Sequence, residues 1–358
     1  MKVLFNVYPS AFQTPGGGEV QLMKTKEYLQ RLGVDVQLFD QWKDSLEECD
    51  VFHTFGSVKD CLSIQQAAKH SGAKTALSTI CWYDLRSAYY TYTDLKGRTL
   101  SLARHFAKLF VPLTPSMRKS LMHVSDILFP NSWLEAEQLV RYFHVPKEKI
   151  FVVPNGVDER FIHADPSLFA REYGLENFIL FVGRIEPRKN QLTFVRAMRD
   201  TSQTIVFLGG ALPDYESYYA QCKQEASPNM YFLDAVGHDD PLLASAYAAC
   251  NTFVLPSWFE TPGLSAMEAA LAGAKVVITE GGSTQEYFKD LVRYVRPNDL
   301  RDIRKTTLEA FDAPKDNRLK DHVRGNYSWM RVAEKTLEGY RRLAEGRRGS
   351  IDMAGRQT

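Results

Sequence analysis

Several features that would place a protein in a special class are missing or scarce in this sequence of 358 residues. The cysteines number only five, lie scattered along the chain and form no Cys-x-x-Cys pair. This scarcity argues against a disulfide framework and against a zinc site, and it suits a reducing compartment. The net charge is only +1, so no strong field points to a nucleic-acid partner. No apolar run approaches the roughly 18 residues of a membrane-spanning helix.

What the chain does have is many short apolar runs that alternate with longer helical patterns. Runs such as KVLFNVY at residues 2–8 and FILFVG at residues 178–183 are typical of buried strands. Their alternation with helices predicts βαβ units and parallel sheets. The length exceeds what one hydrophobic core usually serves. We therefore predict an α/β fold with two doubly wound parallel-sheet domains and a boundary near residues 155–166.

Three loops that follow strands attract attention, because active sites in such sheets lie beyond the carboxyl ends of the strands. The first is TPGGGEVQLM at residues 14–23, in which Gly17 and Gly18 precede a helix that starts near Glu19. Glycines allow close backbone approach, and a helix N-terminus favours an anion. This loop is compatible both with a phosphate or substrate site and with a plain tight turn.

The second loop is FVGRIEPRKNQLTF at residues 181–194, where the predicted strand ends at Gly183. Arg184 and Lys189 follow, at the carboxyl end of a parallel strand and beside a helix N-terminus. An arginine fork and a lysine point charge in this position suit a diphosphate. The alternative is that both are solvated surface cations.

The third loop is PSWFETPGLSAMEAALAG at residues 256–273, which leads from a strand into an alanine-rich helix. Glu268 lies among small and apolar residues, where an unpaired carboxylate is costly. A ribose diol would supply hydroxyl donors to it, and the alternative partner is an Arg or Lys of the same domain. Glu260 precedes the helix, within reach of sugar hydroxyls. Pro262 lies at the helix opening, and the backbone N–H groups of Gly263, Leu264 and Ser265 there are free for an anion.

These motifs together resemble one enzyme family. FETPGLSAMEAALAGAKVVIT resembles the E-x7-E signature of the retaining glycosyltransferases of the GT-B fold, family 4, and FVGRIEPRKN resembles that family's Arg/Lys loop. GGGEVQLMKTKEYLQRLGVDV is similar to its N-terminal glycine loop and first helix. VVPNGVD and SWMRVAEKTLEGYRRL are similar to its inter-domain segment and closing helix. The motifs keep the family's order and span nearly the whole chain.

The resemblance implies two Rossmann-like domains that face a central cleft. Residues 1–157 would form the acceptor domain and residues 158–328 the nucleotide-sugar donor domain. A closing helix at about 329–345 would cross back to the N-terminal domain, and residues 346–358 would form a flexible tail.

The resemblance also implies roles for the residues of the three loops. Arg184 and Lys189 would bind the diphosphate, Glu260 the hydroxyls of the donor sugar, and Glu268 the ribose. The catalytic residues would be Glu260, Arg184 and Lys189. The donor-binding residues would be Gly17, Gly18, Gly183, Pro262, Gly263, Leu264, Ser265, Glu268 and Thr284. No Asp-x-Asp motif occurs, so we expect no metal and no cofactor, with the cations and the helix N-terminus stabilising the leaving diphosphate.

One departure from the family concerns the acceptor side. Many members carry a His where this sequence has Cys81, and a thiol is a weaker hydrogen-bond donor than an imidazole. Either the neighbouring residues Trp82, Tyr83 and Asp84 take over part of the contact, or that role is absent. His53, predicted at a strand end, is a further cleft candidate, with a structural hydrogen bond as the alternative.

Residues 95–125 contain no Asp or Glu but six Lys and Arg residues, and they follow the aromatic stretch YYTYTD. Such a basic segment can lie on an anionic membrane surface; a solvated face paired with acids elsewhere is the alternative.

The sequence thus favours a metal-independent, retaining hexosyltransferase that uses a nucleoside-diphosphate sugar, of mannose or rhamnose type. Its acceptor would be a glycan or a lipid-linked glycan in surface polysaccharide assembly. We expect the protein in the cytoplasm or peripherally at the inner face of the plasma membrane, without a nucleic-acid partner. Two alternatives stay open: a non-catalytic nucleotide- or glycan-binding protein on the same scaffold, and a nucleotide-sugar epimerase.

Overall fold

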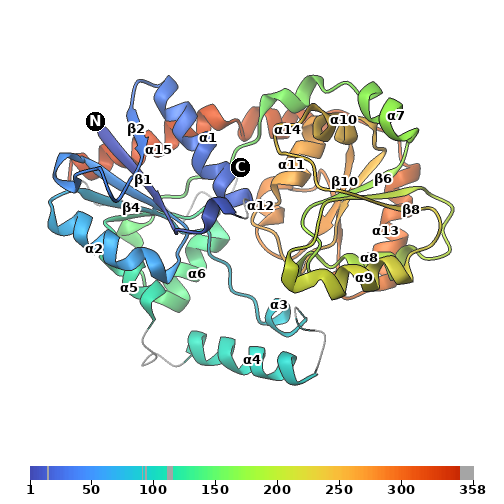
Figure 1. Ribbon diagram of the computed structural model, residues 1–358, viewed down its shortest axis with the longest axis horizontal. Coiled ribbons are helices and arrows are strands. Elements are labelled where there is room, and N and C mark those ends of the chain that lie inside the picture. Colours follow the sequence, from blue (N-terminus) through green and yellow to red (C-terminus); the bar gives the residue numbers. More distant parts are fainter. Residues whose placement is uncertain (14–15, 91, 93–94, 111–115, 347–358) are drawn as a thin grey trace. The chain divides into compact units, whose positions relative to one another are not determined.

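The computed structural model describes residues 1–13, 16–90, 92, 95–110 and 116–346 (Figure 1). The chain divides into two compact units. Unit 1 consists of residues 1–83, 106–156 and 329–358, and unit 2 consists of residues 84–105 and 157–328. Nearly all of the predicted tail, residues 347–358, lies outside the described residues.

Unit 1 is built on a parallel sheet with the strand order β2–β1–β3–β4–β5. The strands are β1 (Lys2–Val7), β2 (Asp35–Leu38), β3 (Val51–Phe55), β4 (Lys74–Ser78) and β5 (Ile127–Phe129). The helices are α1 (Gly17–Arg31), α2 (Leu62–His70), α5 (Met117–Val124), α6 (Trp133–Phe143) and α15 (Trp329–Ala344). The short turns η1 (Ala11–Gln13), η2 (Leu46–Glu48), η3 (Lys59–Cys61) and η4 (Lys147–Lys149) connect them.

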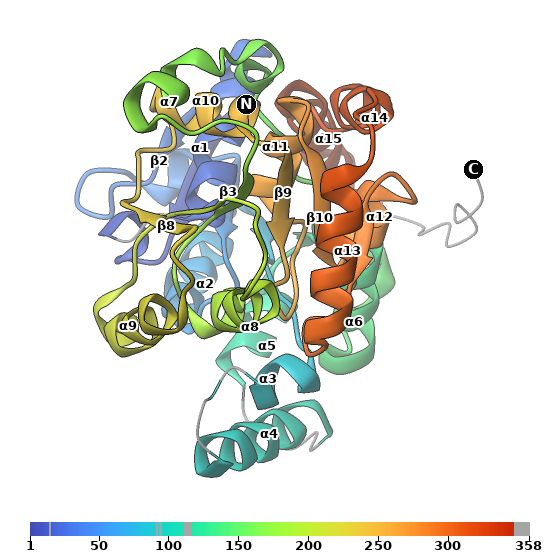
Figure 2. The ribbon, with the colours of Figure 1, turned by 90° about the vertical axis from the view of Figure 1, so that its right-hand side faces the viewer.

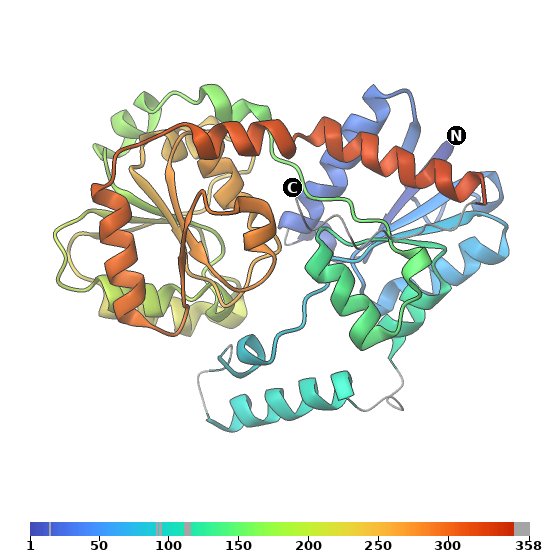
Figure 3. The same cartoon turned by 180° about the vertical axis from the view of Figure 1, so that it is seen from behind.

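Alternate residues of the strands point to opposite faces of this sheet, as strand geometry requires. Val51 and Phe55 pack with the apolar side chains of α1 and α15, whereas Phe52 packs on the opposite face with α2. Helix α15 lies next to α1, and Figure 3 shows it along the back of the unit 1 sheet. It approaches the sheet so closely that a Cβ added at Gly339 would lie 2.5 Å from the ring of Phe129. The last helix of the described residues therefore belongs to the core of unit 1.

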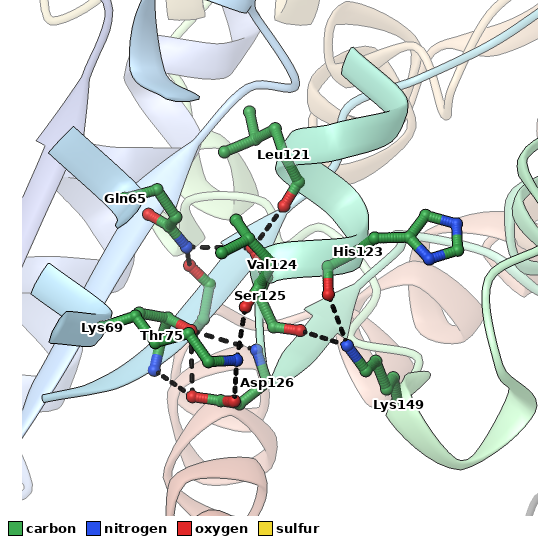
Figure 4. Close-up of polar contacts among 10 residues, drawn as sticks. Gln65, Lys69, Thr75, Leu121, His123, Val124, Ser125, Asp126 and Lys149 are labelled. Carbon is green, nitrogen blue, oxygen red and sulfur yellow. Dashed lines mark hydrogen bonds and ion pairs between the residues drawn. The ribbon is translucent and has the colours of Figure 1, made fainter. Parts of the chain in front are cut away.

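A polar network fixes the amino-terminal edge of this sheet (Figure 4). Asp126, just before β5, accepts from Lys69 Nζ at 2.7 Å and from the backbone N–H of Thr75 at 2.9 Å. Lys149 Nζ donates to the carbonyls of His123 and Ser125 at 2.6 and 2.9 Å. These bonds connect α2, β4, the α5–β5 turn and η4. They lie at the amino ends of the strands, whereas ligand sites in such folds lie at the carboxyl ends.

Unit 2 is built on a parallel sheet with the strand order β11–β10–β9–β6–β7–β8. Figure 2 shows β9 and β10 side by side in this sheet. The strands are β6 (Ile179–Val182), β7 (Ile205–Leu208), β8 (Met230–Leu233), β9 (Thr252–Leu255), β10 (Lys275–Thr279) and β11 (Arg293–Val295). The helices that cover it are α7 (Ser167–Tyr173), α8 (Gln191–Met198), α9 (Glu216–Glu225), α10 (Pro241–Ala249), α11 (Leu264–Leu271), α12 (Thr284–Phe288), α13 (Leu300–Asp312) and α14 (Arg318–Asn326). The turns η5 (Glu159–His163), η6 (Pro187–Lys189) and η7 (Pro213–Tyr215) complete the unit.

The central strands of unit 2 are continuous apolar runs because both of their faces are covered by helices. Every residue of β7 and β9 is buried. Unit 2 also includes α3 (Leu85–Tyr90), although this helix comes from the first third of the chain. It is followed by α4 (Leu95–Phe110). The predicted α/β fold with two doubly wound parallel sheets is confirmed.

Candidate functional site

The strand order of unit 2 marks the position of a site. From β6 the chain proceeds outward through β7 and β8, and it then returns to the other side of β6 to form β9, β10 and β11. Strands β6 and β9 are therefore neighbours at the point where the winding direction changes. In doubly wound sheets, ligands bind at the carboxyl ends of the strands beside this point. The loops that follow β6 and β9 are two of the three loops singled out in the sequence.

These two loops meet through a buried ion pair. Lys189 Nζ donates to Glu260 Oε1 at 2.7 Å, and the exposed fractions of the two side chains are 13% and 6%. Burial alone would raise the pKa of Glu260, but attraction to Lys189 and Arg188 holds that pKa below its usual value. Burial lowers the pKa of Lys189, an effect that Glu260 opposes. The pair places an ammonium group and a carboxylate side by side at the switch point.

Arg188 is a second cation of this loop, and the sequence interpretation overlooked it. Its Nη2 lies 2.9 Å from Glu186 Oε1, and its Nη1 lies 3.7 Å from Glu260 Oε1. The predicted cation Arg184 is more open, because 42% of its side chain is exposed and its Nε lies 4.0 Å from Glu186 Oε2. The loop thus offers three cations, of which Arg184 is the most accessible. Arg188 stands next to Lys189 in the EPRKN motif, which was the available signal.

The backbone around Glu260 is held by the loop that follows β10. Glu260 N–H donates to the Gly281 carbonyl at 3.2 Å, and Ser283 N–H donates to the Glu260 carbonyl at 2.9 Å. Gly282 has a φ of +95°, and a Cβ there would lie 2.0 Å from the Glu260 carbonyl oxygen. Only glycine fits this position. Thr284, predicted to bind the donor, is fully buried and donates its hydroxyl to the Thr279 carbonyl at 2.9 Å. This bond closes the loop between β10 and α12.

Helix α11 starts directly after the Glu260 loop. Gly263, with a φ of +93°, is its N-cap, so Leu264 and Ser265 open the helix as predicted and Pro262 precedes it. The first N–H groups of a helix have no intrahelical acceptor. At the end of β6, Gly183 adopts a φ of +151°.

Glu268 is almost completely buried, with 6% of the residue exposed, and it is bound by protein donors at both oxygens. His238 Nε2 lies 3.0 Å from Oε1, and the Tyr247 hydroxyl donates to Oε2 at 2.8 Å. The alternative of a direct Lys or Arg partner is not what the structure shows, because the ion pair of Glu268 is with His238, and Arg160 contacts His238. Sequence reasoning missed His238 and Tyr247, because neither stands near Glu268 in the chain.

Helix α3 covers the same loops from the side. The rings of Tyr90 and Trp258 stack with centroids 4.4 Å apart and an interplanar angle of 7°. The backbone N–H of Trp258 donates to the Arg188 carbonyl at 3.0 Å. This bond connects the ring stack to the loop that carries Lys189. The guanidinium of Arg98 lies 5.8 Å from the centroid of Tyr90. No motif in the sequence indicated this contact.

The candidates in unit 1 fare differently. Gly17 and Gly18 begin α1 as predicted, but the side chain of Glu19 already caps the N-terminal end of this helix. Its Oε2 accepts from the N–H of Gly16 at 2.7 Å, and its Oε1 accepts from the Tyr8 hydroxyl at 3.0 Å. The sequence left open a phosphate or substrate site and a plain tight turn at this loop. In the structure the carboxylate of Glu19 lies at the helix N-terminus.

His53 lies in the core of unit 1 and not on a ligand-binding surface. It is 1% exposed, and its ring nitrogens lie 2.6 Å from the Tyr340 hydroxyl and 3.0 Å from Ser78 Oγ. Burial lowers its pKa to about 3, so the imidazole is neutral. The cleft role proposed for His53 is wrong, because the residue stands in the middle of β3. Its structural alternative is what the structure shows.

Cys81 follows β4 and is 4% exposed. Burial raises the pKa of its thiol to about 12, which leaves it a weak donor. Its backbone N–H donates to Glu135 Oε1 at 2.7 Å. Tyr83 accepts a bond from Arg118 at 2.6 Å through its hydroxyl. Trp82, Tyr83 and Asp84 are each half-buried.

One family model matches part of this chain. Residues 176–312 match the family model described as glycosyl transferases group 1, and all of them lie in unit 2. A D-inositol 3-phosphate glycosyltransferase of Paenarthrobacter aurescens is 29% identical over 244 residues, which are 61% of this chain and 58% of that protein. The chain thus spans less than two thirds of the length of this relative.

Solved structures match over nearly the whole chain. Sucrose-phosphate synthase from Thermosynechococcus elongatus has a TM-score of 0.74 at 17% identity, covering 97% of this chain and 100% of that one. HepE from Anabaena, in complex with UDP, has a TM-score of 0.67 at 16% identity, covering 94% and 99%. At such low identity these structures establish the common fold.

Proposed function

The chain belongs to the glycosyl transferases group 1 and has the GT-B fold, and from this premise we propose that it is a retaining hexosyltransferase. It would move a hexosyl group from a nucleoside-diphosphate sugar to a hydroxyl of a glycan or lipid-linked glycan. The curated relative acts, by its name, on an inositol phosphate, and the Anabaena structure holds UDP. The first supports a polyol or sugar acceptor for this chain, and the second supports a nucleotide-sugar donor.

The observation that carries the proposal is the ion pair between Lys189 and Glu260 at the switch point of unit 2. Transfer of the sugar leaves a diphosphate whose negative charge grows in the transition state. Fixed cations near that charge stabilise the transition state without reorganising at the moment of reaction. Lys189 and Arg184 supply this charge in the proposal, assisted by Arg188. These cations would also make a metal unnecessary for the reaction.

Glu260 has two tasks in the proposal. It holds the ammonium of Lys189 in place, and its remaining lone pairs accept bonds from hydroxyls of the donor sugar. Orienting the sugar in this way increases the reaction rate, because it holds the anomeric carbon in position for the acceptor hydroxyl. Glu268 receives the ribose at the start of α11. We assign the donor sugar to the mannose or rhamnose class and the pathway to surface polysaccharide assembly.

A membrane surface is the second part of the proposal. Helix α4 has no acidic residue, exposes Lys96 and Arg104, and also exposes Leu95, Leu100 and Phe106 by 69%, 47% and 55%. Cations beside exposed apolar side chains favour binding to an anionic bilayer. Lys108 is one of the six cations counted in residues 95–125, and its side chain lies outside the described residues. None of the helices in the described ranges is long and apolar enough to cross a bilayer. In the proposal, the exposed cations and apolar side chains of α4 bind the protein peripherally to the inner face of the plasma membrane.

The test is a turnover assay with UDP-, GDP- and dTDP-sugars in the presence of oligosaccharide and lipid-linked acceptors, with and without EDTA. Acceptor-dependent release of nucleoside diphosphate that EDTA leaves unchanged supports the proposal. The variant Glu260→Gln should lower kcat by at least tenfold while changing nucleotide affinity little. Nucleotide binding without turnover for any sugar would favour the non-catalytic alternative, and a changed donor sugar without transfer would favour an epimerase.

A further inference from the structure

Glu268 is held from two sides by side chains that no motif indicated. Tyr247 comes from α10, and its ring packs against Phe161 and Phe253 with centroid distances of 5.6 and 5.8 Å. It is fully buried, and burial raises its pKa well above 10, an effect that Glu268 reinforces. The hydroxyl therefore keeps its proton and can only donate to Glu268 Oε2.

His238 binds the other oxygen from the loop that follows β8. Arg160 donates to the carbonyl of His238, and its Nη2 lies 3.2 Å from His238 Nδ1. Arg160 is itself anchored to Asp239 at 2.8 Å. His238 Nδ1 also lies 3.4 Å from Asp239 Oδ1, farther than the 3.0 Å between Nε2 and Glu268 Oε1. A guanidinium cannot accept a hydrogen bond, so in the neutral ring a bond from Arg160 to Nδ1 leaves the proton on Nε2, facing Glu268. In the imidazolium form Nε2 also carries a proton, so His238 donates to Glu268 in both protonation states.

Two donors leave part of the carboxylate unused. An ionised carboxylate has about four lone-pair positions, and two of them are taken by His238 and Tyr247. The bonds also remove the rotational freedom of the side chain, so that little ordering remains to be done when a ligand arrives. A lone carboxylate among alanines would be free to turn and costly to bury.

We propose that His238 and Tyr247 are positioning residues that fix Glu268 for the ribose diol of a nucleoside diphosphate. His238 thereby determines how strongly the protein distinguishes ribose from 2′-deoxyribose. This inference rests on the proposed function, since it assumes that a nucleotide binds at α11. It adds a series of contacts in which Arg160 holds His238 and His238 orients the carboxylate of Glu268.

The experiment is isothermal titration of the full chain with UDP, GDP and ADP, followed by the 2′-deoxy analogue of the one that binds most tightly. A hydroxyl bond to a charged group should make the ribonucleotide bind roughly tenfold more tightly than its analogue. The variant Glu268→Gln should reduce this ratio to about one. His238→Ala should reduce it to about threefold or less, because Glu268 loses its orientation, and Tyr247→Phe should have a similar effect.

Two further variants separate positioning from general damage. His238→Gln should restore most of the ratio, because the amide N–H of Gln can donate to Glu268. His163→Gln changes an exposed His on the same turn as Arg160 and should keep the wild-type ratio. A wild-type ratio in His238→Ala, or in Glu268→Gln, would overturn the inference while leaving the proposed function intact. Failure of the wild-type chain to bind any of the three nucleotides would instead overturn the proposed function, and the inference with it.

Discussion

The ammonium nitrogen of Lys189 lies 2.7 Å from Glu260 Oε1, although the two residues are 71 positions apart in the chain. Each belongs to a loop that follows one of two neighbouring strands, and both side chains are largely buried. The pair is therefore at once a contribution to the stability of unit 2 and the core of the proposed diphosphate site. These two functions can be measured separately.

We predict that Lys189→Gln lowers the free energy of unfolding by roughly 3–5 kcal/mol, because it leaves a buried carboxylate without its main partner. The measurement is urea denaturation followed by tryptophan fluorescence. Replacing both residues, Lys189→Met with Glu260→Met, should recover much of this loss. The control is Lys305→Gln, which breaks an exposed pair with Glu309 on α13 and should cost about 0.5 kcal/mol or less. Equal effects of the buried and exposed variants would contradict the prediction.

The Tyr90–Trp258 stack should hold α3 against unit 2. Aromatic pairs contribute about 0.5–1.5 kcal/mol beyond their burial, so Tyr90→Ala should increase amide hydrogen exchange in residues 85–90 several-fold. Tyr90→Phe keeps the ring and should exchange like the wild type. Should the Phe and Ala variants exchange at the same raised rate, the ring stack is not what holds the helix.

His53 makes the stability of unit 1 depend on pH. Its pKa is about 3 in the folded chain, compared with roughly 6.5 in an unfolded chain. Between these values the unfolded state binds the proton and the folded state does not. The contribution of the neutral His53 to the free energy of unfolding is therefore complete above pH 6.5 and is lost as the pH falls toward 3.

Lowering the pH from 7.5 to 5.5 should therefore cost about 1.4 kcal/mol through this residue alone. The measurement is the free energy of unfolding at both pH values in the wild type and in His53→Gln. The quantity compared is the loss of that free energy between pH 7.5 and pH 5.5 in each protein. The variant should lose about 1.4 kcal/mol less than the wild type. Identical losses would show that His53 titrates normally in the folded chain.

Helix α4 should bind anionic vesicles through its exposed cations. Removing Lys96 and Arg104 together should weaken binding to vesicles that contain phosphatidylserine by about 2 kcal/mol, since each cation near such a surface contributes about 1 kcal/mol. Co-sedimentation at physiological salt measures this. Arg118 is a poor choice for the same test, because it is bonded to the Ser57 carbonyl and the Tyr83 hydroxyl. Unchanged sedimentation would identify α4 as an ordinary solvated surface.

The sequence predicted the parts of the site that lie in loops after strands. Lys189, Glu260 and Glu268 could be found because glycine, proline and charge stand out against apolar strand patterns, and because strand ends meet at one edge of a parallel sheet. The partners of Glu268 could not be found in this way. Tyr247 lies inside an ordinary helix pattern, and His238 becomes significant only once β8 is placed beside β7.

The mistakes have physical causes as well. His53 was taken for a strand-end residue, but β3 extends two residues further, to Phe55, and carries it into the core. The glycine loop was correctly placed at the start of α1, yet the sequence could not tell that Glu19 folds back to cap its own helix. Local patterns identify elements, whereas such contacts depend on side-chain geometry.

The assignment of residues 84–105 to unit 2 has a practical consequence for protein engineering. The chain passes from one unit to the other at four points, after residues 83, 105, 156 and 328. A hybrid enzyme joined only near residue 157 would combine a foreign α3 with the native Trp258, and the ring contact would be lost. Exchanges of unit 2 between relatives should therefore transfer residues 84–105 together with residues 157–328 as a single cassette.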